Sequence, residues 1–208
     1  MLPIEKPLAE LALLDKYFSP HGVHFELPAN TVLTFSNIDP DNVTVVLNQG
    51  EIAISRKYND VLMGIVNAPF VKGLSTSIIK RPTEYIYTTQ NSCSGYYLPA
   101  ELSLKLVEEH QLWRESFCWL TWWYRLAETR DCQLIGSSTY DQIRSTLLIM
   151  AEWEETLRAR VGVIQYIQKR TGISRSVIAE MLSALRQGNY IEMSKGKLTK
   201  INRLPYEY

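Results

Sequence analysis

The feature that most constrains the fold is a long segment, residues 100–135, that contains neither proline nor glycine. These 36 residues would span about 54 Å as one α-helix, at a rise of about 1.5 Å per residue. We therefore expect one long helix after residue 99, and the rest of the chain has to be arranged around it.

Apolar residues of this segment fall in two stripes. One repeats at alternating steps of four and three, the spacing of a heptad seam, and consists of Leu106, His110, Trp113, Phe117, Leu120, Tyr124 and Ala127. A second stripe beside it consists of Leu112, Ser116, Trp119, Trp123 and Leu126. A surface helix needs only one apolar face, so two stripes favour a dimerisation helix that packs on its own chain and, through Trp113, Phe117, Leu120 and Tyr124, on a second subunit. A core helix buried on several sides is the alternative.

The segment before residue 99 has the pattern of short strands. Runs rich in β-branched or aromatic residues alternate with turn residues at 31–35, 43–47, 51–55, 61–66, 85–89 and 96–98. This pattern predicts a sandwich, jelly roll or roll-like barrel. Residues 4–18 have apolar positions at roughly helical spacing and predict a short amphipathic helix that ends near Ser19 and Pro20.

The C-terminal part has the order of a winged helix-turn-helix. A hinge at residues 136–139 precedes a helix that begins near Tyr140 and is capped by Ser138 or Thr139. Further on, a short helix from Val163, a tight turn at residues 171–174 and a second helix at 175–187 are followed by two strands around a Lys195-Gly196 turn.

In a winged helix-turn-helix the second helix enters the DNA major groove and its N-terminal residues meet base edges. We expect base contacts from its exposed residues, which are Arg175, Ser176, Ala179, Glu180 and Ser183. Ser174, with the free N–H groups behind it, suits a phosphate. Basic residues around this helix and on the wing, Lys169, Arg170, Lys195 and Lys197, complete the candidate DNA-binding set.

The net charge of the whole chain is zero, with 22 basic and 22 acidic residues, and taken alone it speaks against a nucleic-acid binder. The charges are segregated, however. Residues 163–208 hold eight basic and three acidic residues, a balance of +5, so residues 1–162 hold 14 and 19, a balance of −5. This segregation favours DNA binding by the last part of the chain, and a winged helix that binds a protein partner is the alternative.

Other classes of function have little support. The three cysteines, Cys93, Cys118 and Cys132, form neither a disulfide framework nor a metal-ligand pattern, and His21 and His24 lack a third ligand. Cys132 lies near Arg130 and is a possible redox thiol, although inert thiols are the default. We expect no enzymatic activity, no cofactor and no metal. No apolar run is long enough to span a membrane and no secretory signal is visible, so a cytoplasmic protein is expected.

In its order of elements the chain resembles the cyclic-AMP-receptor/FNR superfamily of bacterial transcription regulators. Residues 172–182, Gly-Ile-Ser-Arg-Ser-Val-Ile-Ala-Glu-Met-Leu, are similar to the family's Gly-x-Ser-Arg-x-x-(aliphatic)-x-x-(aliphatic)-Leu motif. Residues 48–51 resemble the family's early roll turn, and residues 70–74 stand where the family has its nucleotide cradle. Nearly end to end, the chain is similar to an enterobacterial branch named inhibitors of hydrogen peroxide resistance, through residues 111–119, 140–144 and 188–193.

The resemblance implies an α+β fold in three parts: an N-terminal helix and antiparallel β-roll of the cyclic-nucleotide-binding type at 1–98, the dimerisation helix at 99–136, and a winged helix-turn-helix at 137–208. It implies a homodimer that binds a pseudo-palindromic double-stranded DNA operator. By the same resemblance, the physiological theme is the response to oxidative stress.

The chain also departs from the superfamily. Where nucleotide binders have Gly-Glu-Leu it has Lys72-Gly73-Leu74, and Pro82 stands beside Arg81 where a phosphate would want a backbone N–H. We therefore expect no cyclic nucleotide, and the N-terminal cysteine cluster of iron–sulfur sensors is absent. Ser176 and Glu180 differ from the cyclic-AMP receptor's pattern, so its base preference does not carry over. A roll that senses a small ligand other than a nucleotide remains open, and the sequence does not identify an effector.

Overall fold

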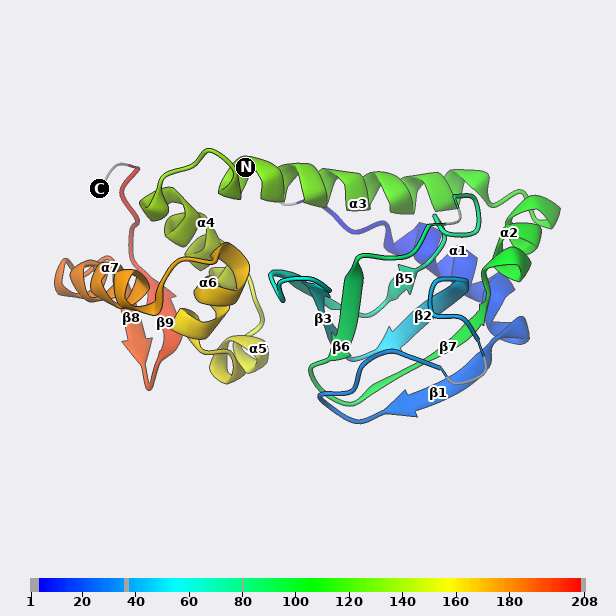
Figure 1. The fold of residues 1–208 in the computed structure, drawn as a ribbon, viewed down its shortest axis with the longest axis horizontal. Coiled ribbons are helices and arrows are strands. Elements are labelled where there is room, and N and C mark those ends of the chain that lie inside the picture. The colour runs from blue at the N-terminus through cyan, green and yellow to red at the C-terminus, as the bar shows by residue number, and fades with distance from the viewer. Residues whose placement is uncertain (1–3, 36–37, 80, 207–208) are drawn as a thin grey trace. The chain divides into compact units, whose positions relative to one another are not determined.

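The computed structural model describes residues 4–35, 38–79 and 81–206 (Figure 1). The chain divides into two compact units: Met1–Asn59 with Met63–Ala127, and Asp60–Leu62 with Glu128–Tyr208. The predicted α+β class is confirmed, because the first unit combines two sheets with helices and the second carries helices with a two-stranded hairpin. Within the described residues no helix is both long and apolar enough to cross a membrane.

The first unit is a β-roll built from two sheets. One has the strand order β1-β7-β2-β5 and the other β4-β3-β6. The pairs β1·β7, β2·β7, β2·β5 and β3·β6 are antiparallel. The strands are β1 (Val23–Leu27), β2 (Val43–Gln49), β3 (Glu51–Arg56), β4 (Leu62–Asn67), β5 (Phe70–Lys72), β6 (Tyr85–Thr89) and β7 (Cys93–Pro99).

Three details of the strand prediction are wrong, and one of them is that the short strand β5 was not predicted. The expected strand at 31–35 is only a single bridge, Val32 to Thr88. The segment still lies along β6 (Tyr85–Thr89): the Thr31 carbonyl accepts from the Thr89 N–H at 2.9 Å and the Leu33 N–H donates to the Tyr87 carbonyl at 2.8 Å. The Thr31 N–H, however, donates to the Thr89 side-chain Oγ1 at 2.8 Å. The edge strand β1 was not predicted, although its alternating apolar and polar residues have the period of a strand.

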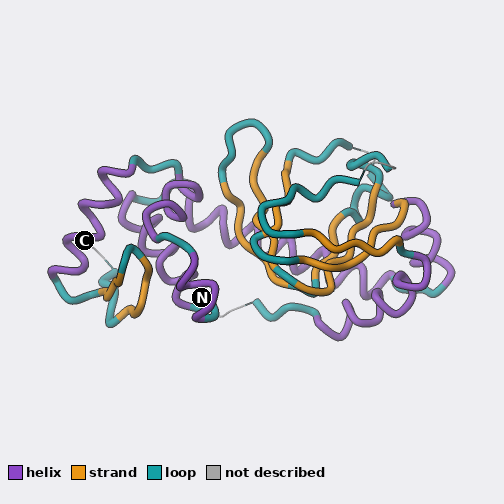
Figure 2. Tube along the Cα trace, turned by 90° about the horizontal axis from the view of Figure 1, so that it is seen from below, coloured by secondary structure: helices purple, strands orange, loops and turns teal. Residues whose placement is uncertain are grey.

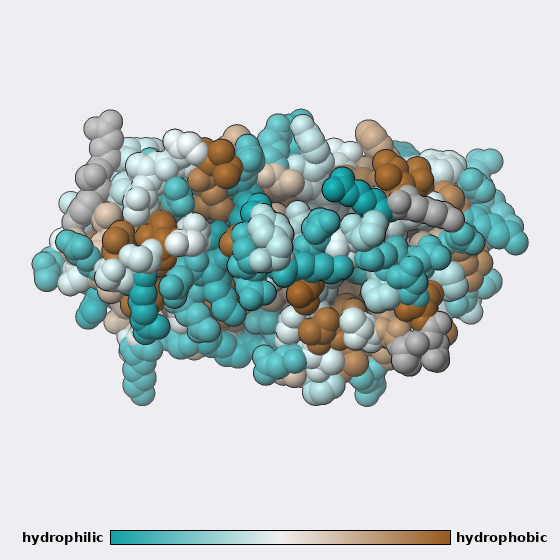
Figure 3. All heavy atoms as spheres, in the orientation of Figure 1, coloured by the Kyte–Doolittle hydropathy of each residue, from teal (hydrophilic) through white to brown (hydrophobic). Residues whose placement is uncertain are grey.

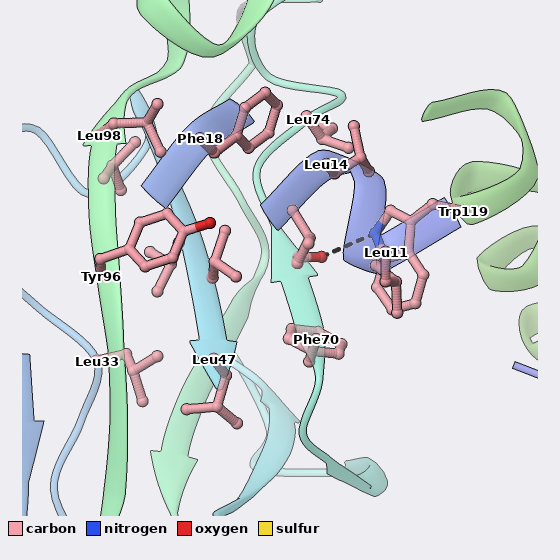
Figure 4. Close-up of a cluster of buried hydrophobic side chains, with 14 of the residues drawn as sticks. Leu11, Leu14, Phe18, Leu33, Leu47, Phe70, Leu74, Tyr96, Leu98 and Trp119 are labelled. Atoms are coloured by element: carbon pink, nitrogen blue, oxygen red, sulfur yellow. Dashed lines mark hydrogen bonds between the residues drawn. The ribbon is translucent and has the colours of Figure 1, made fainter. Parts of the chain in front are cut away.

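The core of the first unit is formed by residues of both sheets and of the helices packed against them, and Figure 4 shows part of it. Helix α1 (Leu8–Phe18) confirms the predicted amphipathic helix and is followed by a 3₁₀ turn, η1 (Ser19–His21). It buries Leu11, Leu14 and Phe18 on one face. The Tyr96 hydroxyl donates to Asp15 Oδ1 at 2.8 Å, which ties α1 to β7.

The single long helix predicted over residues 100–135 is broken into α2 (Ala100–Glu109) and α3 (Trp113–Leu134). Gln111 adopts a left-handed φ of 55°. The Leu112 N–H donates to the Val107 carbonyl at 2.9 Å, and the Gln111 N–H donates to the Glu108 carbonyl at 3.3 Å. These are the two hydrogen bonds of a Schellman motif, which ends α2 without a glycine. The predicted middle segment, residues 99–136, is moreover shared between the two units.

The second unit contains α4 (Thr139–Ala151), α5 (Glu155–Arg160), α6 (Val163–Thr171) and α7 (Arg175–Gln187), followed by β8 (Ile191–Ser194) and β9 (Lys197–Ile201). In Figure 2 the hairpin is the short orange segment beside the purple helices of this unit. The predicted cap of α4 is confirmed, since Ser138 Oγ accepts from the Asp141 N–H at 3.1 Å. The predicted winged helix-turn-helix order is present, and α5 is an element that was not predicted.

Candidate nucleic-acid interface

The turn between α6 and α7 has the conformation that its sequence predicts. Gly172 ends α6 in the left-handed region at φ 77°, which favours glycine. Ser174 then caps α7, because its Oγ accepts the Val177 N–H at 3.4 Å. These two residues set the direction in which α7 leaves the turn.

Helix α7 presents one polar face and one apolar face. Ile178, Leu182 and Leu185 are buried against the second unit. The exposed residues of α7 and its N-cap include Ser174, Arg175, Ser176, Ala179, Glu180 and Ser183. All six residues predicted to meet DNA from this helix are therefore accessible, and we call these six residues the α7 face.

The wing is a hairpin with a tight turn. Lys195 and Gly196 both have positive φ, at 48° and 77°, as a two-residue type I′ turn requires. The Gly196 carbonyl accepts from the Val163 N–H at 3.0 Å, so the wing tip is fixed to the start of α6.

The two wing lysines differ. Lys195 is exposed, whereas Lys197 is half-buried and its ammonium group donates to the Arg160 carbonyl at the end of α5. Lys195 is therefore the wing cation best placed for a phosphate. This anchoring role of α5 was missed because no sequence pattern connects residue 160 with residue 197.

One predicted DNA contact needs correction. Arg170 is only 5% exposed, and its Nη2 donates to Gln133 Oε1 at 3.2 Å. Burial raises the pKa of the Tyr166 hydroxyl, and the positive charge and hydrogen bond of Arg170 act in the opposite direction and lower that pKa. Arg170 therefore stabilises the second unit from inside. Lys169, one residue earlier on α6, is exposed as predicted.

The basic charge of the second unit is concentrated near its C-terminus. Residues 128–208 hold twelve basic and nine acidic residues, a balance of +3, against the +5 of residues 163–208. The excess therefore belongs to the part that contains α6, α7 and the wing. This agrees with the charge expected of a DNA-facing surface.

Over α3 the two stripes are separated as the sequence predicts, whereas Leu106, the first residue of the predicted heptad stripe, lies on α2 and is buried. Leu112, Ser116 and Trp119 are buried in the first unit. The other stripe is accessible, with Trp113, Phe117 and Tyr124 exposed to 47%, 71% and 65% and Leu120 partly buried. We call Trp113, Phe117, Leu120 and Tyr124 the outer stripe. An exposed apolar row of this kind is typical of an interface.

The region that corresponds to a nucleotide cradle is occupied by the protein's own contacts. The Lys72 ammonium donates to the Pro40 carbonyl at 2.9 Å, and desolvation lowers its pKa. The Thr83 N–H donates to Asp41 Oδ1 at 2.9 Å, so this backbone donor is already used. A Cβ at Gly73 would lie 2.2 Å from the Val43 carbonyl oxygen, so a larger residue at this position would clash with the backbone of β2.

The three cysteines have different surroundings. Cys93 is buried, and burial raises the pKa of its thiol. Cys118 is partly buried on α3, and Cys132 is exposed near the end of the same helix. Cys132 is thus the thiol that a solution oxidant reaches most easily.

Comparison with known proteins agrees with this architecture. Residues 139–206 match the model of a winged helix-turn-helix DNA-binding family. The fold is similar to that of the c-di-GMP-responsive global regulator CLP of Xanthomonas campestris, with TM-score 0.72, 17% identity, and coverage of 92% of this chain and 99% of that one. It is also similar to a putative CRP/FNR-family transcriptional regulator of Eubacterium rectale, with TM-score 0.69, 14% identity, and coverage of 91% and 90%. The chain therefore has the fold of the CRP/FNR regulators.

Relatives in sequence define the chain more narrowly. It is 48% identical over 208 residues to the inhibitor of hydrogen peroxide resistance of Salmonella typhimurium, and 49% identical over 208 residues to that of Escherichia coli K12. In both cases the match covers 100% of each chain. The chain belongs to the family of inhibitors of hydrogen peroxide resistance.

Proposed function

We propose that the protein is a homodimeric transcription regulator that binds a pseudo-palindromic DNA duplex through two winged helices. The observation that carries this proposal is the α7 face, a set of exposed and mostly polar residues that runs from the N-cap Ser174 to Ser183 of α7. It lies in the part of the chain with the basic excess. A helix of this kind fits a major groove about 12 Å wide.

On this surface Arg175 is the residue suited to a base contact. It stands in the first turn of α7 and is exposed, so its guanidinium can reach O6 and N7 of a guanine. Glu180, five residues or about 1.4 helical turns further on, accepts from cytosine N4. Ser174 and Lys195 contact phosphates, which position the helix but carry no base preference.

The outer stripe of α3 makes the dimer in this proposal. A two-fold axis along paired α3 helices would remove the exposed rings of Trp113, Phe117 and Tyr124 from water. The two winged helices of such a dimer are proposed to bind half-sites one helical turn, about 34–36 Å, apart.

The regulatory theme comes from the relatives. Proteins 48–49% identical to this chain are named inhibitors of hydrogen peroxide resistance, so we propose that the genes controlled here affect peroxide tolerance.

Cys132 is the proposed redox thiol, because it is exposed on the helix that forms the dimer. A Cys132→Ser variant whose DNA affinity and oligomeric state change with peroxide as those of the native protein do contradicts that role.

The test of the proposal is genome-wide footprinting of the purified full chain, with and without peroxide, followed by titration of recovered sites at several salt concentrations. A regulator gives discrete two-fold-symmetric sites whose affinity falls steeply as salt rises, because cations are released from the phosphates. An absence of salt-dependent duplex affinity favours a protein-interaction module.

A further inference from the structure

An apolar groove lies in the first unit between α2, α3 and the segment that follows β5. Its volume is about 530 Å³, within the range of about 300–1,000 Å³ that is typical of small-molecule sites. Its walls are Leu74 and Ile78 from the segment after β5, Leu104 from α2, and Phe117 and Leu120 from α3. It is separate from the residues that correspond to a nucleotide's phosphate contacts, Lys72 and Arg81, neither of which lines it.

One polar group of this groove lacks a partner. Ser116 lines the groove and is only 7% exposed. Among the residues that the structure describes, its Oγ is buried and makes no hydrogen bond. A buried hydroxyl without a partner is costly, and it is a signal of a ligand that supplies the missing bond.

A single cation lies at the same groove. Arg114 lines it and is exposed, and the described part of the chain shows no ion pair to its guanidinium. Apart from Arg114, Ser116 and Ser77, the residues that line the groove are apolar. An apolar wall with one arginine at its edge selects a molecule with an apolar body and one anionic group.

We propose that this groove binds a small amphiphilic carboxylic acid of the fatty-acid type. The alkyl chain packs on Leu74, Ile78 and Phe117, and the carboxylate pairs with Arg114. The Ser116 hydroxyl donates to a ligand oxygen. That oxygen belongs either to the carboxylate or to a hydroxyl on the chain.

Occupation of the groove is coupled to assembly. Three of the four residues of the outer stripe, Trp113, Phe117 and Leu120, also line the groove, so the ligand changes the surface on which the second subunit packs. This coupling, unlike the binding itself, rests on the proposed dimer. Binding and dimerisation are thermodynamically linked. The factor by which the ligand changes the dimerisation constant equals the factor by which dimerisation changes the affinity for the ligand.

Figure 3 shows apolar residues reaching the surface among hydrophilic ones on the face that carries α3 along its upper edge. Two neighbouring exposed residues provide a matched pair for the test. Ile78 lines the groove and is 57% exposed, whereas Ile79 is 71% exposed and is not part of the groove wall. Ile78→Glu and Ile79→Glu add the same charge at adjacent accessible positions, and neither residue is in the proposed DNA or dimer surface.

The experiment titrates the full chain by calorimetry with decanoate, 3-hydroxydecanoate and uncharged decanol, all below their micelle concentrations. We expect Ile78→Glu to weaken decanoate binding more than about tenfold, because it places a second negative charge in an apolar groove, and Ile79→Glu to change it less than twofold. We expect Arg114→Gln to weaken decanoate about fivefold and to leave decanol unchanged. If the Ser116 hydroxyl donates to the carboxylate, Ser116→Ala weakens the binding of both acids. If it donates to a hydroxyl on the chain, Ser116→Ala weakens only the binding of 3-hydroxydecanoate.

Equal binding of decanoate by the native chain and Ile78→Glu overturns the proposed site, and an Arg114→Gln variant with native affinity overturns the anionic ligand class. Sedimentation with and without decanoate tests the coupling separately. A chain that is monomeric at all concentrations yet binds decanoate defeats the proposed dimer and the coupling but supports the site. If neither the dimer nor the dissociated monomer binds decanoate, the proposed site is overturned. The proposed function as a DNA-binding dimer is not affected by that result.

Discussion

The indole N–H of Trp119 donates to the backbone carbonyl of Val71 at 2.9 Å and fixes α3 to strand β5 (Figure 4). The Trp119 ring also lies edge-on to Phe70 at 5.5 Å and stacks on Trp122 at 4.9 Å. The inner stripe of α3 is therefore held by a directed hydrogen bond as well as by burial. Because the outer stripe is on the same helix, this bond also orients the proposed dimer surface.

We expect Trp119→Phe to destabilise the first unit by about 2–4 kcal/mol, from the lost hydrogen bond and from the cavity left by the smaller ring. Urea unfolding followed by far-UV circular dichroism measures the change. The control is Trp113→Phe, which alters an exposed ring on the same helix and should cost less than about 0.5 kcal/mol at concentrations where the chain is monomeric. Equal losses for the two variants contradict the role of the Val71 contact.

Two N-cap serines allow stability to be separated from DNA binding. Ser138 caps α4 and Ser174 caps α7, each through its Oγ. We expect Ser138→Ala and Ser174→Ala each to cost about 0.5–2 kcal/mol of stability. Only Ser174→Ala should weaken duplex affinity beyond that loss, because only Ser174 belongs to the α7 face. Fluorescence anisotropy at a temperature where both variants are folded distinguishes them, and a Ser138→Ala variant with the same binding defect argues against a phosphate contact by Ser174.

Arg175→Ala should weaken specific DNA binding by about 1–3 kcal/mol, the value of a good base contact. Arg81→Ala removes one exposed positive charge from the first unit and controls for net charge. Lys195→Ala should instead weaken specific and random duplexes alike and lower the salt slope by about one. An unchanged operator affinity of Arg175→Ala in a gel-shift titration removes Arg175 from base recognition.

The sequence anticipates most of the elements because their signals are local. Gly172, Ser174 and the Lys195-Gly196 turn each specify their own backbone, and the apolar periods of α7 and α3 separate inner from outer faces correctly. The break at Gln111 was not predicted, because glutamine, unlike glycine or asparagine, has no preference for the left-handed region. Asn189, at φ 57°, ends α7 in the same way, although Gly188 stands beside it.

Residues whose role depends on distant parts of the chain were the ones predicted least well. The burial of Arg170 depends on Gln133, 37 positions away, and the anchoring of Lys197 depends on Arg160, also 37 positions away. A charged residue on a short helix looks the same in sequence whether it faces DNA or its own domain. Only the packing of α6 against its neighbours decides between the two.

The proposed dimer is tested most directly at Tyr124, which is 65% exposed on the outer stripe and does not line the groove between α2 and α3. We expect Tyr124→Asp to shift the chain towards monomer by at least about tenfold in dissociation constant, because two like charges would face each other near the two-fold axis. The matched control is Tyr58→Asp, a 71% exposed tyrosine of the β-roll outside the stripe. Sedimentation velocity over a range of concentrations reports both, and equal behaviour of the two variants rejects the outer stripe as the interface.

The last prediction concerns pH and Lys6. The Lys6 ammonium donates to the Asn67 carbonyl at 2.6 Å and lies 5.6 Å from the centre of the Trp122 ring. Burial lowers the pKa of Lys6 from 10.5 to about 8. Between these two values the unfolded chain binds a proton that the folded chain does not, so the free energy of unfolding rises with pH over this range.

Lys6→Met removes the cost of burying the charge. The variant should therefore gain stability at pH 7 and lose the rise between about pH 8 and 10.5, the range that follows from the pKa of Lys6. Tyr87 sets the upper limit of the useful pH range, because burial raises its pKa from 10.0 to about 12. Above pH 10 this tyrosine ionises in the unfolded chain but not in the folded one, so the free energy of unfolding falls again. Urea unfolding at pH 7, 8, 9 and 10 measures the effect, with Lys105→Met, an exposed lysine of α2, as the control. A native-like rise in Lys6→Met assigns the pH dependence to another group.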